Sequence, residues 1–467
     1  MSETTTSKRL AFYGGPFMAL IPFLVFVVGV IAIALSGAPD EKGFWPVLIL
    51  ALGIGLLLSK DKSQFSQTVL EGMSDKMVMI MITAWMLASI IGVLMSLTGF
   101  VEALIWMAEG LQLGGVGFVL ASFIICCVVS LSTGSSFATI LICGPLLYPS
   151  GGILGAHLPS LAGAILAGAT FGDFIAPISD TTIASSLSQG ADIGKVVKSR
   201  IKYMVPVFIF ACLAFYISAD SGFTTVKGLE AKLSGVPNAL PMLLVPALII
   251  YLFLKGKHLL EGLLLGLLFG VVLALLLGLL QIDQVFSLDL ENFGAKSFVI
   301  DGINRAVGIS FFTILLMGLV ATLKASGLLD KLVDLASAKS KKAADGERWI
   351  AATSAVSVLL TTHSIVAILM LADFSKESGE KLGIGSIRRA NILSMVVCVF
   401  PFLLPYFIPV ILMANTSNSG QDFGIPSVNA LETGFHNFLA WGLLGMVMIL
   451  VLFGWGRKKD ELLSKTE

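Results

Sequence analysis

The sequence predicts an all-α membrane protein, a polytopic helical bundle of two inverted-topology repeats, each with a re-entrant hairpin and a broken transmembrane helix. Three observations lead to this fold class. Of the 467 residues, 56% are hydrophobic and 13% are charged, which is about half the charged share of an ordinary soluble protein. Apolar runs close to the roughly 20 residues that cross a bilayer recur along the whole chain. The third observation is an internal repeat, described below.

Apolar runs bounded by polar breaks mark the expected spanning helices. They cover residues 12–36, 44–58, 77–99, 202–218, 238–254, 258–280, 303–325 and 432–454. The first run exceeds the 7–15 residues of a signal-peptide core, so we expect it to be retained. We predict one transmembrane domain over residues 1–467. Its parts are N-terminal helices at 12–70, repeat one at 71–218, connecting helices at 238–280, and repeat two with the C-terminal helix at 301–454.

The charge distribution predicts the orientation of these spans. Lysine and arginine are concentrated in alternate loops, and such positive segments stay in the cytoplasm. We therefore expect a multi-pass protein of the bacterial inner (plasma) membrane with both termini cytoplasmic. The 30 basic and 30 acidic residues balance, which gives no sign of a nucleic-acid partner. The five cysteines lie inside apolar runs without paired spacing, so we expect no disulfide and no zinc.

The internal repeat relates two parts of the chain at an offset of about 229 residues. The matched segments are Glu71-Gly72 with Asp301-Gly302, Ser132-Thr133-Gly134-Ser135 with Thr361-Thr362-His363-Ser364, and Pro177 with Pro405. The charge bias has the first copy entering the membrane from the cytoplasm and the second from outside. Opposite topology of this kind is typical of secondary transporters.

Each copy contains a segment too short and broken to span twice. In the first copy, residues 114–131 run inward, a hydroxyl-rich break follows at 132–136, and residues 137–148 return. The counterpart in the second copy is 349–360, 361–364 and 365–373. Irregular backbone at membrane depth is tolerated where it is buried in protein or lines a cavity. We expect the two hairpin tips to meet near the midplane.

Two carboxylates in an apolar segment are the strongest functional signal. Residues 159–190 carry no charge except Asp173 and Asp180, and each isolated carboxylate there would cost about 2.5–3.5 kcal/mol. Pro177 lies between them and favours a broken helix with freed carbonyls. Together with Ser179, Thr181 and Thr182, these oxygens suit a hard cation. We predict that Asp173 and Asp180 bind sodium or a proton, with the three hydroxyl residues beside them.

The hairpin tips and the second broken helix supply the other candidate binding residues. Hydroxyls of the first tip compete with a structural role as a polar turn, and His363 either titrates or is a hydrogen-bonded neutral histidine. The second broken helix, residues 390–414, has prolines but no carboxylate, and the residues at its end either bind a ligand or form an external loop. The candidates are Thr133, Gly134, Ser135, Ser136, Thr362, His363, Ser364, Asn415 and Thr416.

One stretch resembles a known family. The run Gly172-Asp173-x-x-x-Pro177-Ile178-Ser179-Asp180-Thr181-Thr182, preceded by the Ser-Thr-Gly-Ser-Ser tip, is similar to the NhaC family of sodium/proton antiporters in the ion-transporter superfamily. The resemblance covers most of the chain and implies a membrane antiporter with Asp173 and Asp180 near the ion site. The chain departs from the family's usual Gly-Thr-Ser-Trp tip and from its typical His-Cys-Ser after the aspartate. The wider family includes exchangers and permeases for carboxylates and amino acids.

These observations favour a secondary active transporter, a sodium/proton antiporter that works by alternating access. The alternative is a sodium-coupled transporter or exchanger of a small organic solute, an amino acid or a carboxylate, because the tips are rich in hydroxyls and we expect no arginine in the membrane interior. We predict no enzyme and no cofactor, with Na+ as the transported or coupling ion. The partners are Na+, H+ and the lipid bilayer, and a homodimer is one alternative for the assembly.

Overall fold

The computed structural model describes residues 9–35, 41–111, 114–177, 179–220, 237–255, 257–289, 294–328 and 342–457. Helices make up most of these residues. The N-terminal part contains η1 (Pro16–Ala19), α1 (Leu20–Leu35), η2 (Glu41–Gly43), α2 (Phe44–Leu58) and α3 (Lys62–Met73). Next come α4 (Lys76–Leu97), α5 (Phe100–Gly110), α6 (Gly115–Thr133), α7 (Ser136–Ile153), α8 (Leu158–Ile175), α9 (Asp180–Ser188) and α10 (Ile193–Asp220).

The second half of the chain begins with a connecting region and continues with further helices. That region contains η3 (Pro237–Leu243), α11 (Leu244–Leu254), α12 (Leu259–Leu276), α13 (Ile282–Val285) and the antiparallel strands β1 (Ser287–Asp289) and β2 (Gly294–Lys296). The C-terminal part contains α14 (Phe298–Ala325), α16 (Ala343–Thr361), α17 (Ser364–Met370), α18 (Ala372–Lys381), α19 (Ser386–Val397), η4 (Phe400–Phe402), α20 (Ile408–Thr416), η5 (Ser417–Phe423), α21 (Ala430–Phe435) and α22 (Phe438–Leu452).

Long apolar helices make this a multi-pass membrane protein. Six of the described helical segments are long and apolar enough to cross a bilayer: Pro16–Ile33, Val78–Leu97, Ser136–Ile153, Leu158–Ser188, Ile193–Ala219 and Phe298–Ala325. Five shorter apolar helices accompany them. A bilayer offers no water to backbone groups, and helices satisfy those groups internally. The predicted class, an all-α membrane protein, is confirmed.

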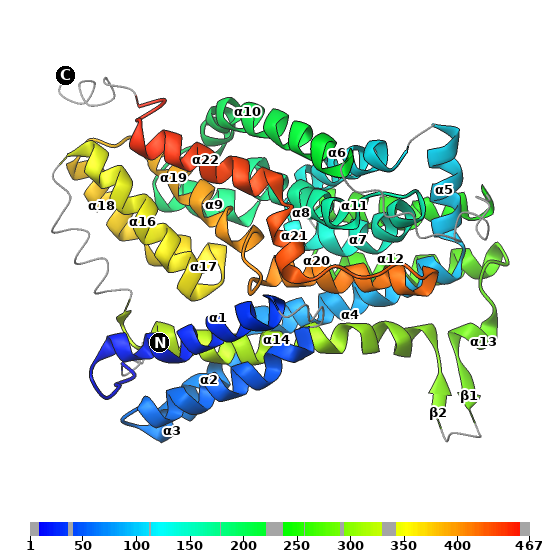
Figure 1. Cartoon of the computed structure of the whole chain (residues 1–467), viewed down its shortest axis with the longest axis horizontal. Helices are drawn as coiled ribbons and strands as arrows, with labels where there is room; N and C mark the ends of the chain where they lie inside the picture. The colour runs from blue at the N-terminus through cyan, green and yellow to red at the C-terminus, as the bar shows by residue number, and fades with distance from the viewer. Residues whose placement is uncertain are drawn as a thin grey trace.

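Two long helices from the two halves of the chain, α4 and α14, pack against each other. Figure 1 shows them with α1, α2 and α3 on one side of the molecule, while the hairpins and broken helices lie on the other side. A Cβ atom on Gly72 would lie 2.5 Å from the carbonyl oxygen of Met317. A Cβ atom on Gly302 would lie 2.5 Å from the Cα atom of Ile90. Each half of the chain therefore supplies a glycine at which a helix of the other half passes closely.

Both predicted hairpin breaks are present, and each turns through a left-handed residue. Gly134 has φ 66° and separates α6 from α7, while Thr362 has φ 52° and separates α16 from α17. The predicted end of the first return arm at residue 148 was wrong, because α7 continues to Ile153 through two internal prolines. Each proline removes one backbone donor. The helix persists because 83% of its residues are buried among neighbouring helices.

The two broken helices also lie where the sequence predicts them. In the first, α8 ends at Ile175 and α9 begins at Asp180, with Pro177 between them. In the second, α19 ends at Val397, and α20 begins at Ile408 after a short 3-10 turn that contains Pro401. The prolines remove donors that a continuous helix requires, so each chain segment changes course inside the bundle.

Small residues let α6 and α8 approach closely and fix the position of the first break. Ser130 Oγ of α6 donates a 2.7 Å hydrogen bond to the carbonyl of Ala169 in α8. A Cβ atom on Gly168 would lie 2.3 Å from the Cβ atom of Cys126, and one on Gly172 would lie 2.0 Å from Ser130 Oγ. The glycine that precedes Asp173 therefore sets the depth at which this aspartate enters the bundle.

We expect Gly172→Ala to destabilise the protein by about 1–3 kcal/mol, because overpacking a tight contact forces helices apart. Thermal unfolding in detergent measures the effect as a lower melting temperature. Gly445→Ala in α22 is the matched control, since no atom lies within 4 Å of a Cβ atom there. That substitution should raise stability slightly through helix propensity. Equal melting temperatures for the two variants would contradict the packing argument.

Candidate functional site

The two hairpin tips and the two helix breaks surround one cavity of about 70 Å³. Its wall contains residues from α7, α8, α9, α17, η4 and α20. The lining residues are Gly134, Ser135, Ser136, Phe137, Asp173, Ser179, Asp180, Thr181, Thr362, His363, Ser364, Ile365, Pro401, Phe402, Ile408 and Pro409. The structure thus brings together most of the residues that the sequence singled out.

Asp173 joins the first broken helix to the first hairpin tip. One carboxylate oxygen accepts a 2.7 Å hydrogen bond from Ser136 Oγ, and the other accepts a 3.2 Å bond from the backbone N–H of Ser136. Ser136 is the first residue of α7, so the carboxylate lies at the positive end of that helix. It also lies near the negative, C-terminal end of α8. The contacts with α7 stabilise its charge there.

The hydroxyls of the first break cap the carbonyl that the missing helical turn leaves free. Ser179 Oγ donates a 3.0 Å hydrogen bond to the carbonyl oxygen of Asp173, and Thr181 Oγ1 donates to the same atom. The two hydroxyls lie 3.0 Å apart. A hydroxyl that donates its proton keeps two lone pairs on oxygen. Ser179 and Thr181 therefore hold the break in shape and can still coordinate a cation in the cavity.

Asp180 and His363 face the same cavity from different halves of the chain. Asp180 begins α9 and is exposed, and its carboxylate has no hydrogen-bond or ion-pair partner among the described residues. His363 precedes α17, and its buried Nδ1 has no hydrogen-bond partner within the described part of the chain. A buried polar atom without a partner costs free energy unless a ligand or water satisfies it. Both groups are therefore available to an occupant of the cavity.

A buried arginine of α10 holds the first break together. The guanidinium of Arg200 donates to the carbonyl of Phe174 at 2.6 Å and to Thr182 Oγ1 at 2.8 Å. It also donates to Ser185 Oγ at 3.1 Å and to Asn391 Oδ1 at 3.1 Å. The guanidinium carbon lies 4.9 Å from the centroid of the Phe174 ring. One side chain thus links α8, α9 and α19.

The expectation that the membrane interior holds no arginine was wrong. Arg200 is fully buried within the spanning segment Ile193–Ala219. In the sequence, Arg200 stands among Lys195, Lys198 and Lys202, and a basic cluster of this kind is typical of a cytoplasmic loop. A helical count would have identified it, since it shares a buried stripe of α10 with Val196 and Tyr203, while Lys198 is exposed. Asn391 and Ser185 were also missed, because neither lies in a recognisable motif.

Three of the predicted residues whose side chains are described, Thr182, Asn415 and Thr416, do not line this cavity. Thr182 Oγ1 accepts a hydrogen bond from Arg200 instead. Asn415 and Thr416 line a separate cavity of about 40 Å³ beside Arg305, whose guanidinium binds both carboxylate oxygens of Asp422 at 2.7 and 3.0 Å. Thr133 ends α6, and its side chain lies outside the described part of the structure.

The arrangement of donors and acceptors suits a small cation or a proton. The cavity wall offers two carboxylates, several hydroxyls and one imidazole nitrogen, and oxygen ligands are those that hard cations prefer. A water molecule needs roughly 10–15 Å³ of such space, so about 70 Å³ holds several waters or an ion with part of its hydration shell. The carboxylates that line the cavity come from α8 and α9, whereas the residues from α17, η4 and α20 that line it carry no carboxylate.

The sequence is similar to those of known antiporters. Residues 5–219 match the Na+/H+ antiporter family. The chain is 27% identical over 250 residues to the malate-2H+/Na+-lactate antiporter of Bacillus subtilis (strain 168). The aligned region covers 52% of this chain and 51% of that protein. It is 24% identical over 394 residues to the Na+/H+ antiporter NhaC of Alkalihalophilus pseudofirmus, covering 78% of this chain and 81% of the relative. Thus the chain spans about half the length of the first relative.

A solved structure is also similar in part. The protein of the study titled "Structure and Function of Neisseria gonorrhoeae MtrF Illuminates a Class of Antimetabolite Efflux Pumps" aligns over 94% of this chain and 95% of its own, with 11% identity and a TM-score of 0.37.

Proposed function

Because residues 5–219 match the Na+/H+ antiporter family, we propose that the chain is a sodium/proton antiporter whose ion site is the cavity around Asp173 and Asp180. The observation that carries the proposal is the carboxylate of Asp173, held by Ser136 at the N-terminus of α7 and facing a cavity that Asp180 also lines. The same oxygens accept either a sodium ion or a proton. Binding one cation therefore displaces the other.

The size and chemistry of the cavity support an ion as cargo. A volume of about 70 Å³ accommodates a partly hydrated ion, while sites for organic ligands usually measure about 300–1,000 Å³. Sodium would bind the two carboxylates together with the hydroxyl oxygens of Ser136, Ser179 and Thr181. His363 faces the cavity from the second hairpin tip, and its Nδ1, which has no partner among the described residues, can hydrogen-bond to an occupant.

We propose that the binding unit faces the two sides of the membrane in turn, as alternating access requires. Two inverted repeats with re-entrant hairpins would produce this behaviour. The matching left-handed residues at Gly134 and Thr362, and the reciprocal contacts of Gly72 and Gly302, support such a repeat. The charge bias of the loops supports a bacterial inner membrane with both termini in the cytoplasm.

Transport in proteoliposomes tests the proposed function. Adding sodium outside should drive protons out of vesicles loaded with a pH-sensitive dye. Because both cations compete for the same carboxylates, half-saturating sodium should rise as pH falls, approaching tenfold per pH unit where the site is mostly protonated. Lack of any dye response to sodium, or a sodium affinity independent of pH, would rule out this exchange. Choline chloride at equal ionic strength is the control for salt effects.

A second candidate function is the sodium-coupled transport or exchange of a small organic solute. The similarity to a malate-2H+/Na+-lactate antiporter favours it, and so does the neutral wall from repeat two, where His363 Nδ1 has no partner among the described residues. An organic acid would place its carboxylate beside that wall and would require the cavity to widen.

Thermal unfolding in detergent discriminates between the two functions. Malate, lactate and a panel of amino acids are tested with sodium and with choline. If the protein exchanges only sodium and protons, sodium alone should raise the melting temperature, and the solutes should add nothing. A solute that raises it only in the presence of sodium would favour the second function.

A further inference from the structure

A second, larger cavity of about 370 Å³ lies between α10, α16, α19 and the residues that follow α22. It shares no lining residue with the cavity at Asp173. Its wall carries three cationic side chains, one acid and several backbone segments rich in glycine. The lining residues are Ser199, Lys202, Tyr203, Ala343, Glu347, Leu382, Gly383, Ile384, Gly385, Ile387, Arg388, Asn391, Gly456 and Arg457.

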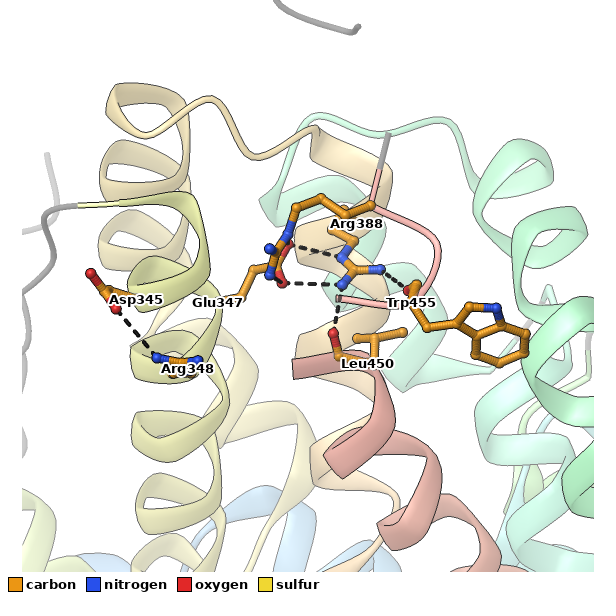
Figure 2. Close-up of polar contacts among 7 residues, drawn as sticks. Asp345, Glu347, Arg348, Arg388, Leu450 and Trp455 are labelled. Carbon is orange, nitrogen blue, oxygen red and sulfur yellow. Dashed lines mark hydrogen bonds and ion pairs between the residues drawn. The ribbon is translucent and has the colours of Figure 1, made fainter. Parts of the chain in front are cut away.

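The cations of this cavity outnumber its single acid. Glu347 is 1% exposed and is bound by two guanidiniums, accepting from Arg388 Nε at 3.0 Å and from Arg457 Nε at 3.1 Å. Figure 2 shows Arg388 between Glu347 and the carbonyls of Leu450 and Trp455. The hydrogen bonds to Glu347 raise the pKa of Arg457 above its ordinary value, so this arginine stays charged. One carboxylate neutralises only one of the two arginines.

Lys202 adds a further positive charge at the wall. Its ammonium lies 4.7 Å from the centroid of the Tyr203 ring, and no acid among the described residues pairs with it. The lining therefore carries about two excess positive charges in a space large enough for a polar headgroup. An excess of this kind, without a counter-ion among the described residues, indicates an anionic ligand.

Hydrogen-bond donors from two helices, α10 and α19, converge on the backbone of Gly456. Gly456 has φ 76°, and a Cβ atom there would lie 2.9 Å from Tyr203 Oη and 3.0 Å from Lys202 Nζ. The same position lies 3.6 Å from Arg388 Nη1. Glycine is thus required both by the left-handed backbone and by the space. The N-terminus of α19, which no side chain caps, meets the cavity at Gly385.

The position of the cavity relative to the bilayer identifies the source of the anion. The outward faces of α10 and α22 are apolar, with Leu213 58% exposed and Phe453 82% exposed. The rings of Tyr203 and Trp455 meet edge to face at 5.6 Å beside the cavity, and aromatic and basic residues of this kind gather where a membrane meets water. These features favour a lipid headgroup as the source of the anion, at the end of the molecule where the sequence predicts the cytoplasm.

We propose that this cavity binds the phosphate group of an anionic phospholipid of the phosphatidylglycerol class, held by Lys202, Arg457 and the donors around Gly456. Basic pockets between spanning helices on the cytoplasmic side recognise such headgroups. The phosphate oxygens would accept from the ammonium and from the guanidinium edge that Glu347 does not use. The lipid would then join α10 and the end of α22 to α16 and α19.

Native mass spectrometry of the detergent-solubilised full chain tests this proposal. Dioleoylphosphatidylglycerol is compared with dioleoylphosphatidylcholine, which has the same chains and a zwitterionic headgroup, and with inorganic phosphate. The variant Lys202→Gln/Arg457→Gln leaves Glu347 paired with Arg388. Its matched control, Lys195→Gln/Lys198→Gln, changes two exposed lysines of α10 outside the cavity. Each basic residue near a membrane surface contributes about fivefold in affinity, so the cavity variant should bind phosphatidylglycerol about 30-fold more weakly.

The control variant should bind phosphatidylglycerol like the unchanged protein, and phosphatidylcholine should bind all three proteins equally weakly. Equal loss of affinity in the two variants would overturn the assignment, because general surface charge would then explain the binding. Inorganic phosphate that binds as tightly as the lipid and depends on Lys202 would place a soluble anion in the cavity and overturn the lipid assignment. The measurement involves no transport, so it stands or fails independently of the proposed antiport.

Discussion

Replacing Asp173 by asparagine should reduce sodium-driven proton movement in proteoliposomes at least about 100-fold. The asparagine still accepts hydrogen bonds from Ser136 but offers sodium no negative charge and cannot exchange a proton. Removing one partner of a buried charge interaction costs about 3 kcal/mol or more, which corresponds to roughly a hundredfold in binding. Dye fluorescence after sodium addition measures the loss at several pH values. If the substitution only shifted the affinity for sodium, proton movement would return at higher pH.

The control for this prediction is Asp373→Asn in α18, an exposed aspartate outside the cavity. It should transport like the unchanged protein. The melting temperature of Asp173→Asn should stay close to that of the unchanged protein, since the contacts with α7 survive. Full transport by a well-folded Asp173→Asn protein would show that the ion does not bind at this carboxylate.

The substitution Arg200→Gln should destabilise the protein by about 3–5 kcal/mol, the cost of breaking a buried charged network. It removes the donor from Phe174, Thr182, Ser185 and Asn391 at once, and a buried acceptor without a donor keeps its full desolvation penalty. The melting temperature in detergent should fall, and sodium-driven proton movement should fall with it. The helix break that positions Asp173 would no longer be fixed.

Two comparisons separate the geometry of Arg200 from its charge. Arg200→Lys keeps the charge but lacks the planar fork of donors, so it should recover only part of the lost stability. Lys198→Gln removes a charge from the exposed face of the same helix and should leave the melting temperature unchanged within error. If Arg200→Gln unfolded at the temperature of Lys198→Gln, the network would have no structural role.

The breaks and the carboxylate cavity could be predicted from the sequence because they depend on local chemistry. Pro177 and Pro401 remove backbone donors, and Gly134 permits a left-handed turn, so each marks its break without any tertiary information. Carboxylates in an apolar segment are likewise visible in a single sequence. The pairing of Asp173 with Ser136 was not visible, since it depends on the angle at which α7 meets α8.

Contacts across the bundle could not be predicted from the sequence, because they depend on how each helix is rotated and placed. Arg200 looked like part of a basic loop, and only the rotation of α10 turns it inward. Asn415 followed the second break closely in sequence, but Ile408 begins the regular helix α20 at the cavity. Seven further residues at 1.5 Å each carry Asn415 about 10 Å away. Distance along a chain is a poor measure of distance inside a helix bundle.

The reciprocal glycine contacts between α3, α4 and α14 bear on the order of assembly during synthesis. Gly72 packs against Met317, and Ile90 packs against Gly302, so about half of the chain separates each pair of partners. A ribosome adds about 5–20 residues each second, and the early helices must wait in the membrane for α14 to emerge. Neither half of the chain can complete this crossing alone. The arrival of α14 therefore closes the bundle, and a nascent chain cut before it would leave Gly72 of α3 and the Ile90 face of α4 exposed to lipid.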